Sequence, residues 1–161
     1  MNSLATLLNE TIGRELPHLR ALSEEQSSVP RAKAGAWTPK QELGHLVDSA
    51  ANNHMRFVLA ALERHYEGPA YAQNDWVALH AYHALPWTTI VDFWYFRNLQ
   101  LVYLFEQIPV DVLGSLCVIN AAPPVELSFL IQDYVVHLQH HIDQLLLREH
   151  VTPYPAATTG V

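Results

Sequence analysis

Two histidines, His137 and His141, lie four residues apart in the most regular amphipathic segment of the 161-residue chain. Leucines and Tyr134 repeat on the same helix face, where a helical bundle places apolar side chains. Two imidazoles at this spacing can reach one metal ion from one side of a helix. Buried imidazoles need partners for their ring nitrogens, and a metal ion is one such partner. The pair therefore predicts one side of a metal site.

A third histidine, His45, lies near the start of another predicted helix, whose first residues carry a clear start signal. Thr38 can cap this helix, Pro39 suits its first position, and Gln41 completes a Thr-x-x-Gln capping box. Taken alone, a single histidine at such a position more often serves structure than metal binding. The residues by themselves leave the role of His45 open.

The segments 37–48 and 137–145 together resemble the two motifs of the DinB-like superfamily of metal-binding four-helix bundles. The first reads Trp-Thr-Pro followed by His-Leu-Val-Asp, and the second reads His-x-x-x-His-x-x-Gln-Leu. The resemblance covers roughly residues 3–149. The superfamily includes bacillithiol transferases and mycothiol-dependent maleylpyruvate isomerase, so the resemblance implies a metal-dependent enzyme.

The resemblance further implies that His45, His137 and His141 bind one divalent ion. Three protein nitrogens would leave coordination positions open for water or substrate, as in catalytic sites. Zinc and nickel both suit three imidazoles, and the sequence does not separate them. His140 projects about 100° away from His141 around the helix and is not expected to be a ligand.

A polar strip follows His45 along its helix at intervals of about one turn: Asp48, Asn52 and Arg56. Asp48 is a candidate general base, or a residue that orients the His45 ring, a role also open to Glu42. Asn52 and Arg56 would line the substrate pocket, where Arg56 could pair with a carboxylate, or would lie on a solvated outer face.

Three further residues carry expectations. Asp133, one turn before the histidine pair, could orient the ring of His137. Arg97 stands on an otherwise apolar helix and is expected to pair with a carboxylate, which could lie across a subunit interface. Cys117 lies among apolar residues with no activating group in the sequence, so a buried and inert thiol is expected.

Helical periodicity and its interruptions predict an all-α four-helix bundle. The four predicted helices, the first with a kink or break at Pro17, cover residues 3–26, 39–64, 88–108 and 125–149. The long connection between the second and third helices, which could contain a short helix at 75–84, would hang over one end of the bundle. Residues 1–150 would form this domain, and residues 151–161 would form a mobile tail.

The composition is that of a single soluble domain. Half of the residues are hydrophobic, 16% are charged, and the net charge is −7 with a calculated pI near 5.7. Without a basic run, binding to nucleic acid is not expected. No signal peptide and no apolar run of about 18–20 residues is found, which predicts a cytoplasmic protein that does not bind membranes. The third helix is apolar all round, which predicts a homodimer.

Three functions remain open at this point. The first is a thiol transferase, in which a low-molecular-weight thiol at the metal attacks an electrophilic substrate. The second is a metal-dependent hydrolase that uses a metal-bound water and would need a general base such as Asp48. The third is a non-catalytic, dimeric metal-binding module related to stress. A zinc protease of the His-Glu-x-x-His type is disfavoured, because Leu138 stands where its glutamate would be.

Overall fold

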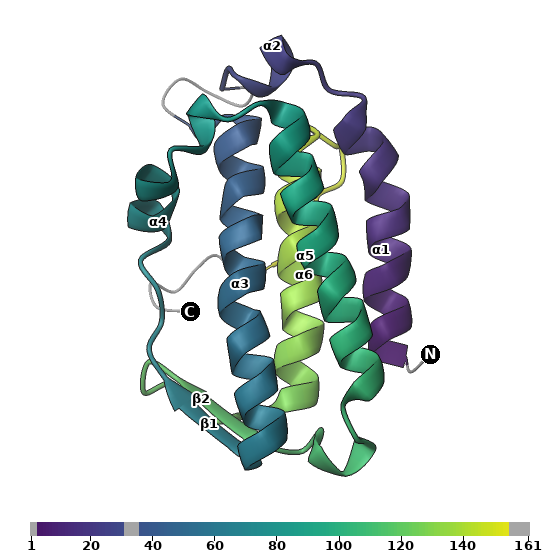
Figure 1. The fold of residues 1–161 in the computed structure, drawn as a ribbon, viewed down its shortest axis with the longest axis vertical. Helices are drawn as coiled ribbons and strands as arrows, with labels where there is room; N and C mark the ends of the chain where they lie inside the picture. The colour runs from purple at the N-terminus through teal and green to yellow at the C-terminus, as the bar shows by residue number, and fades with distance from the viewer. Residues whose placement is uncertain (1–2, 31–35, 155–161) are drawn as a thin grey trace.

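Four long helices form the body of the molecule in the computed structural model, which describes residues 3–30 and 36–154 (Figure 1). The bundle consists of α1 (Ser3–Arg20), α3 (Pro39–Glu63), α5 (Trp87–Gln107) and α6 (Leu127–Leu145). The links hold two short helices, α2 (Glu24–Ser27) and α4 (Gln73–His80), and two 3-10 turns, η1 (Tyr82–Ala84) and η2 (Val110–Val112). The predicted all-α four-helix fold is confirmed.

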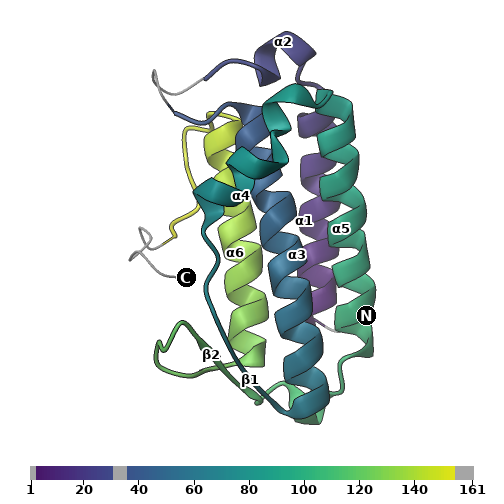
Figure 2. The ribbon, with the colours of Figure 1, turned by 60° about the vertical axis from the view of Figure 1, so that its left-hand side comes forward.

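The direction of the helices decides how the links run. Helices α1 and α6 run in one direction along the bundle, whereas α3 and α5 run in the other (Figures 1 and 2). The end of α3 and the start of α5 therefore lie at opposite ends of the bundle, and residues 64–86 must return along its length. The expectation that this link only covers one end of the bundle is wrong, because parallel neighbouring helices cannot be joined by a short turn.

A small three-stranded sheet at one end of the bundle was not predicted. Strand β1 (His65–Gly68) pairs in parallel with β2 (Leu116–Ile119), and β2 pairs in antiparallel fashion with β3 (Val125–Glu126). Strands of two to four residues carry too little periodicity to be recognised in a sequence. The sheet ties the α3–α5 link to the α5–α6 link. Cys117 is fully buried within it, and burial raises the pKa of its thiol.

Two predicted helix boundaries need correction at the N-terminal end. Helix α1 continues through Pro17 and ends at Arg20, because a proline in the last turn removes only one backbone hydrogen bond. Residues 24–26 belong to the separate helix α2, which has its own capping box between Ser23 and Gln26. The capping box of Thr38 and Gln41 at the start of α3 is present as predicted.

Helix α5 was expected to be buried all round, but within this chain one side of it is exposed. Its inner side packs against α1 and α3, with Trp94 and Leu101 fully buried. Its outer side carries Phe96 and Tyr103, which are 63% and 61% exposed. An aromatic face of this kind is more apolar than a solvated helix surface usually is.

Gly44 in α3 is required by the close approach of Tyr82 from η1. A Cβ added at Gly44 would overlap the Tyr82 ring, whose hydroxyl donates to Asp48 at 2.6 Å. We expect Gly44→Ala to lower the free energy of unfolding by about 2 kcal/mol, because overpacking outweighs the gain in helix propensity. Denaturant unfolding measures this change. Gly13→Ala, in α1 with open space around it, is the control and should stabilise by about 0.5–1 kcal/mol. Equal effects of the two variants would contradict the packing argument.

Within residues 3–30 and 36–154, no helix is both long and apolar enough to cross a membrane. The described part of the predicted C-terminal tail, residues 151–154, lies against α6. There Thr152 donates from its backbone N–H to Asp143 at 2.8 Å, and the Tyr154 hydroxyl donates to Asp133 at 2.9 Å. The rest of the predicted tail, residues 155–161, lies outside the described residues.

Candidate metal centre

The antiparallel packing of α3 and α6 brings the three predicted histidines together. His45 lies in the second turn of α3, and His137 and His141 lie in the last turns of α6, at the same level of the bundle. One ring nitrogen from each residue lies within 4.8 Å of the other two. The Nε2 atoms of His45 and His137 are 3.4 Å apart. Residues 92 positions apart in the sequence therefore form one cluster, named the three-histidine cluster below.

Burial keeps two of these imidazoles, His45 and His137, neutral. His45 is 1% exposed, and burial, together with the neighbouring His141, lowers its pKa to about 3. Burial and the neighbouring histidines also lower the pKa of His137 well below its usual value. A neutral imidazole has a free lone pair on one ring nitrogen, which is the form that binds metal ions.

In two of the rings, a protein group contacts the outer nitrogen, which is the ring nitrogen that faces away from the centre of the cluster. The Nδ1 atom of His141 is paired with the carboxylate of Glu42, and the Nδ1 atom of His45 lies 3.3 Å from the hydroxyl of Tyr71. Such outer contacts fix the tautomer and orientation of histidine ligands in metal sites. Glu42 was expected to orient the ring of His45, but it pairs with His141. Tyr71 was not predicted in this role, because the link that carries it has no periodicity to place it.

His137 is held by ring packing rather than by the predicted carboxylate. The ring centroid of Tyr154 lies 5.2 Å from that of His137, edge to face. Asp133 accepts a hydrogen bond from the Tyr154 hydroxyl, and no hydrogen bond between Asp133 and His137 is found among the described residues. The expectation that Asp133 orients His137 directly is therefore wrong, and its effect on the ring passes through Tyr154.

The separation of one pair of ring nitrogens in the cluster fits a divalent metal ion. With metal–nitrogen bonds of about 2.0–2.1 Å and tetrahedral angles, two ligand nitrogens lie about 3.3–3.4 Å apart. The 3.4 Å separation of the His45 and His137 Nε2 atoms matches this value. The neutral donors of His45 and His137 and the held outer nitrogens of His45 and His141 further suit a site of three imidazoles. His140 lies outside the cluster, with its ring nitrogens against Thr152 and Gln144.

The polar strip along α3 turns away from the cluster. The Oδ1 atom of Asp48 accepts from the Tyr82 hydroxyl at 2.6 Å and lies 2.9 Å from Nδ1 of His80, so Asp48 faces the α4–η1 side. Asn52 donates to the backbone carbonyl of Asp48 at 3.2 Å. Arg56 is 4% exposed and donates to the Pro69 carbonyl at 3.0 Å, which stabilises the link rather than a substrate.

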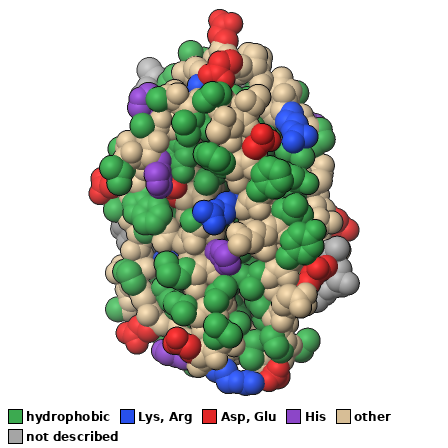
Figure 3. Space-filling view, viewed as in Figure 1, with side chains coloured by type: hydrophobic (Ala, Val, Ile, Leu, Met, Phe, Trp, Pro, Cys, Tyr) green, Lys and Arg blue, Asp and Glu red, His purple; other side chains and the backbone are tan. Residues whose placement is uncertain are grey.

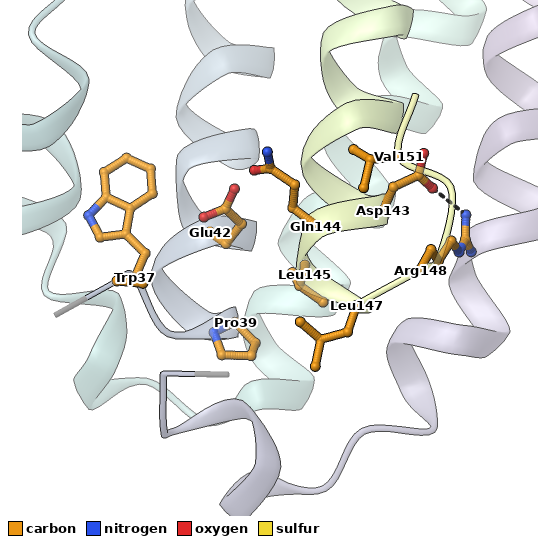
Figure 4. Close-up of a pocket in the computed structure, with 10 residues that line it drawn as sticks. Trp37, Pro39, Glu42, Asp143, Gln144, Leu145, Leu147, Arg148 and Val151 are labelled. Carbon is orange, nitrogen blue, oxygen red and sulfur yellow. Dashed lines mark hydrogen bonds and ion pairs between the residues drawn. The ribbon is translucent and has the colours of Figure 1, made fainter. Parts of the chain in front are cut away.

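A pocket of about 470 Å³ lies beside the cluster, between the start of α3 and the end of α6 (Figure 4). Trp37 and Glu42 form one wall, and Gln144 and Leu147 lie on the opposite side. Trp37 packs against His45 with ring centroids 5.4 Å apart, and Glu42 contacts His141. A ligand in this cluster pocket would meet Trp37 and the Glu42 carboxylate, which contact His45 and His141, while the three histidines themselves do not line the pocket. Neither Asn52 nor Arg56 lines it.

The fold and the cluster together are those of a metal-binding helical bundle, and the sequence matches the model of the DinB superfamily over residues 7–145. The chain belongs to the DinB superfamily. A similar protein of Bacillus cereus (strain G9842), whose name proposes a metal-dependent hydrolase, is 33% identical over 70 residues. That match covers 40% of each chain, so this chain spans well under half the length of that relative.

Solved structures show the same fold. YfiT from Bacillus subtilis, described as a probable metal-dependent hydrolase with an unusual four-helix bundle topology, superposes with a TM-score of 0.79. It is 21% identical, and the match covers 90% of this chain and 84% of YfiT. The mycothiol-dependent maleylpyruvate isomerase superposes with a TM-score of 0.74 at 14% identity, over 88% of this chain and 59% of the isomerase.

Proposed function

We propose that this protein is a metal-dependent enzyme that activates a low-molecular-weight thiol at the three-histidine cluster for attack on an electrophilic substrate. The observation that carries the proposal is the cluster itself, in which three imidazoles converge beside a pocket of about 470 Å³. Burial keeps His45 and His137 neutral, and protein groups hold the outer nitrogens of His45 and His141. A divalent ion held there would lower the pKa of a thiol at an open coordination position. The mycothiol-dependent isomerase with the same fold supports a thiol as partner.

In this proposal, each protein group has a positioning role. His45, His137 and His141 hold the ion, while Glu42 and Tyr71 keep the His141 and His45 rings in place. The cluster pocket provides room for thiol and electrophile side by side, which lowers the entropic cost of their reaction. No protein residue acts as the nucleophile.

Hydrolysis of a substrate by water is the second candidate, and the position of Glu42 favours it. Glu42 lines the cluster pocket and touches His141, so its carboxylate is placed to take a proton from a water in the pocket. Asp48, the base suggested by the sequence, is 2% exposed and is bound by Tyr82 and His80. The Bacillus relatives are named as metal-dependent hydrolases, which supports hydrolysis, just as the mycothiol dependence of the isomerase supports a thiol substrate.

Glu42→Gln separates the two candidates. The amide oxygen of glutamine can still accept from the His141 ring but cannot take a proton. We expect metal-loaded wild type to couple a thiol to monochlorobimane, and the variant to retain this activity within about tenfold. The assay uses glutathione, bacillithiol and mycothiol in turn, beside a panel of ester and amide substrates. If instead the wild type hydrolyses a panel substrate and the variant loses about 10²–10⁴ of that rate, hydrolysis is the function.

Cys117→Ala is the matched control for the thiol assay. Cys117 is fully buried in β2, and its thiol is not expected to react. The variant should therefore couple thiols as fast as wild type. Loss of activity in this variant would contradict the proposal that the external thiol is the nucleophile.

The identity of the ion and the oligomeric state complete the proposal. Zinc and nickel both suit three imidazole ligands. A homodimer remains a prediction. A second subunit would cover exposed apolar side chains on α3 and α5, namely Met55, Leu62 and Tyr103.

A further inference from the structure

A second pocket, of about 550 Å³, lies on the face formed by α3, α4 and α5. Hydrophobic side chains gather over this face, with basic and histidine side chains among them (Figure 3). The walls of the second pocket are largely aromatic, formed by Trp76, Tyr82, Phe93 and Phe96. Phe93 and Phe96 are 48% and 63% exposed, so a ligand that covers them would remove apolar surface from water.

The second pocket is separate from the three-histidine cluster. None of the three histidines lines it. Tyr71 stands between the two sites, with its ring centroid 6.3 Å from that of His45 and 5.2 Å from that of Trp76. A ligand in the second pocket would therefore lie against α3 without contacting His45, His137 or His141.

The two charged residues of the second pocket, Asp48 and Arg97, differ in how accessible their charged groups are to a ligand. Asp48 is 2% exposed: its Oδ1 atom lies within hydrogen-bond distance of Tyr82 and His80, and its Oδ2 atom is buried with no hydrogen-bond partner among the described residues. Arg97, on the exposed side of α5, forms no hydrogen bond or ion pair with any residue in the described ranges. The carboxylate predicted to pair with Arg97 is therefore not found there.

The free charge of Arg97 also acts on its surroundings. Burial lowers the pKa of His54, and the nearby Arg97 guanidinium lowers it further. The side chain of Gln100 lies one turn after Phe96 and adds an amide donor to the same wall. The available groups are thus a guanidinium, an amide and aromatic rings, while the only acid of the pocket is shielded. Such a set recognises a carboxylate carried by a flat apolar body.

We propose that the second pocket binds a small organic anion with an aromatic body, whose carboxylate pairs with Arg97 and whose ring packs against Phe93 and Phe96. This site would be independent of the chemistry proposed for the three-histidine cluster. It could be occupied with or without a metal ion in the protein.

Isothermal titration calorimetry of the metal-free full chain tests the site with two matched probes, 2-naphthoate and the neutral 2-naphthamide. Removal of the metal prevents the carboxylate from binding at the three-histidine cluster. We expect saturable binding of one naphthoate per chain, and weaker binding of the amide. Arg97→Gln should weaken naphthoate about tenfold and leave naphthamide within about twofold. Phe93→Ala should weaken both probes alike, about fivefold.

Arg64→Gln is the control variant, since Arg64 is also exposed but is paired with Asp111 at 2.7 Å and does not line the pocket. It should change neither affinity. Near-ultraviolet circular dichroism shows whether each variant is folded. Equal affinity for the two probes, equal effects of Arg97→Gln and Arg64→Gln, or no saturable binding would each overturn the proposal. So would a dimer in sedimentation analysis that Phe93→Ala turns into a monomer, since the face would then be a subunit contact.

Discussion

Replacing His141 with alanine is expected to abolish stoichiometric binding of a divalent metal, with a loss of affinity of at least about a hundredfold. His141 is one of three imidazoles that converge in the cluster, and its removal leaves only two candidate protein ligands. Loss of a residue that hydrogen-bonds to a metal ligand typically lowers metal affinity about 10–100-fold, and loss of a ligand itself should lower it further. Elemental analysis of untagged protein, followed by competitive titration with zinc, measures the change.

The adjacent residue provides a matched control for this experiment. His140 has the same side chain, but its ring nitrogens lie against the Thr152 carbonyl and the Gln144 side chain. His140→Ala should keep the metal at wild-type stoichiometry. Loss of metal from His140→Ala but not from His141→Ala would make His137 and His140 the ligand pair. Equal binding by both variants and wild type would leave the cluster without a metal-binding role.

Replacing Arg148 with methionine is expected to lower the free energy of unfolding by about 3 kcal/mol at pH 7. Glu15, on α1, has a fully buried side chain, and Asp143, on α6, is 3% exposed. Arg148 pairs with both carboxylates and thereby joins α1 to the end of α6. Figure 4 shows its pair with Asp143. Without it, Glu15 keeps an ion pair only with the half-exposed Arg14, and Asp143 keeps hydrogen bonds from Thr152 and Gln139 but no ion pair among the described residues. This is costly because unpaired charges are poorly solvated inside a protein.

The effect of Arg148→Met should depend on pH in a defined direction. Burial alone would raise the pKa of Glu15, but hydrogen bonds from Arg148 and Arg14 outweigh it and hold the pKa below its usual value of 4.5. A carboxylate with a depressed pKa in the folded state stabilises the protein above its unfolded pKa. This stabilisation is lost as the pH falls through the folded pKa. The difference between wild type and variant should therefore be largest near pH 7 and shrink below about pH 4.5.

Denaturant unfolding between pH 3 and pH 7 measures this dependence. Arg20→Met is the control, because the Arg20 side chain is 57% exposed and lies 3.6 Å from the exposed Asp92. It should cost less than about 0.5 kcal/mol at any pH. A loss in Arg148→Met that is as small as in this control, or that grows on acidification, would contradict the role assigned to the buried carboxylates.

Local sequence signals predicted the helices and placed the histidine pair on one helix face. The capping box of Thr38 and Gln41 marks the start of α3 correctly, because the cap is formed by residues that are neighbours in the chain. The one-turn spacing of His137 and His141 places both on one face of α6, for the same reason. The family motifs supplied His45, whose helix position alone did not distinguish a ligand from a structural histidine.

Contacts made across the bundle were not predictable in the same way. Glu42 was assigned to the wrong histidine, because its partner on α6 depends on how the two helices are rotated against each other. Asp48 was assigned to the cluster, but Tyr82, which reaches α3 from a 3-10 turn, draws it to the opposite side. Tyr71 orients His45 from a link that no periodic pattern describes.

The sequence by itself determined which segments are helical, which imidazoles share a helix face, and which family the chain resembles. Each of these depends on periods of a few residues or on short motifs, and the backbone geometry of a helix converts such periods directly into positions. Only the tertiary structure decided that α3 and α5 run in parallel, that the acids of α3 face different pockets, and that Arg97 pairs with no carboxylate of residues 3–30 and 36–154. These features depend on the direction and rotation of whole helices, which are set by the packing of all their buried side chains at once.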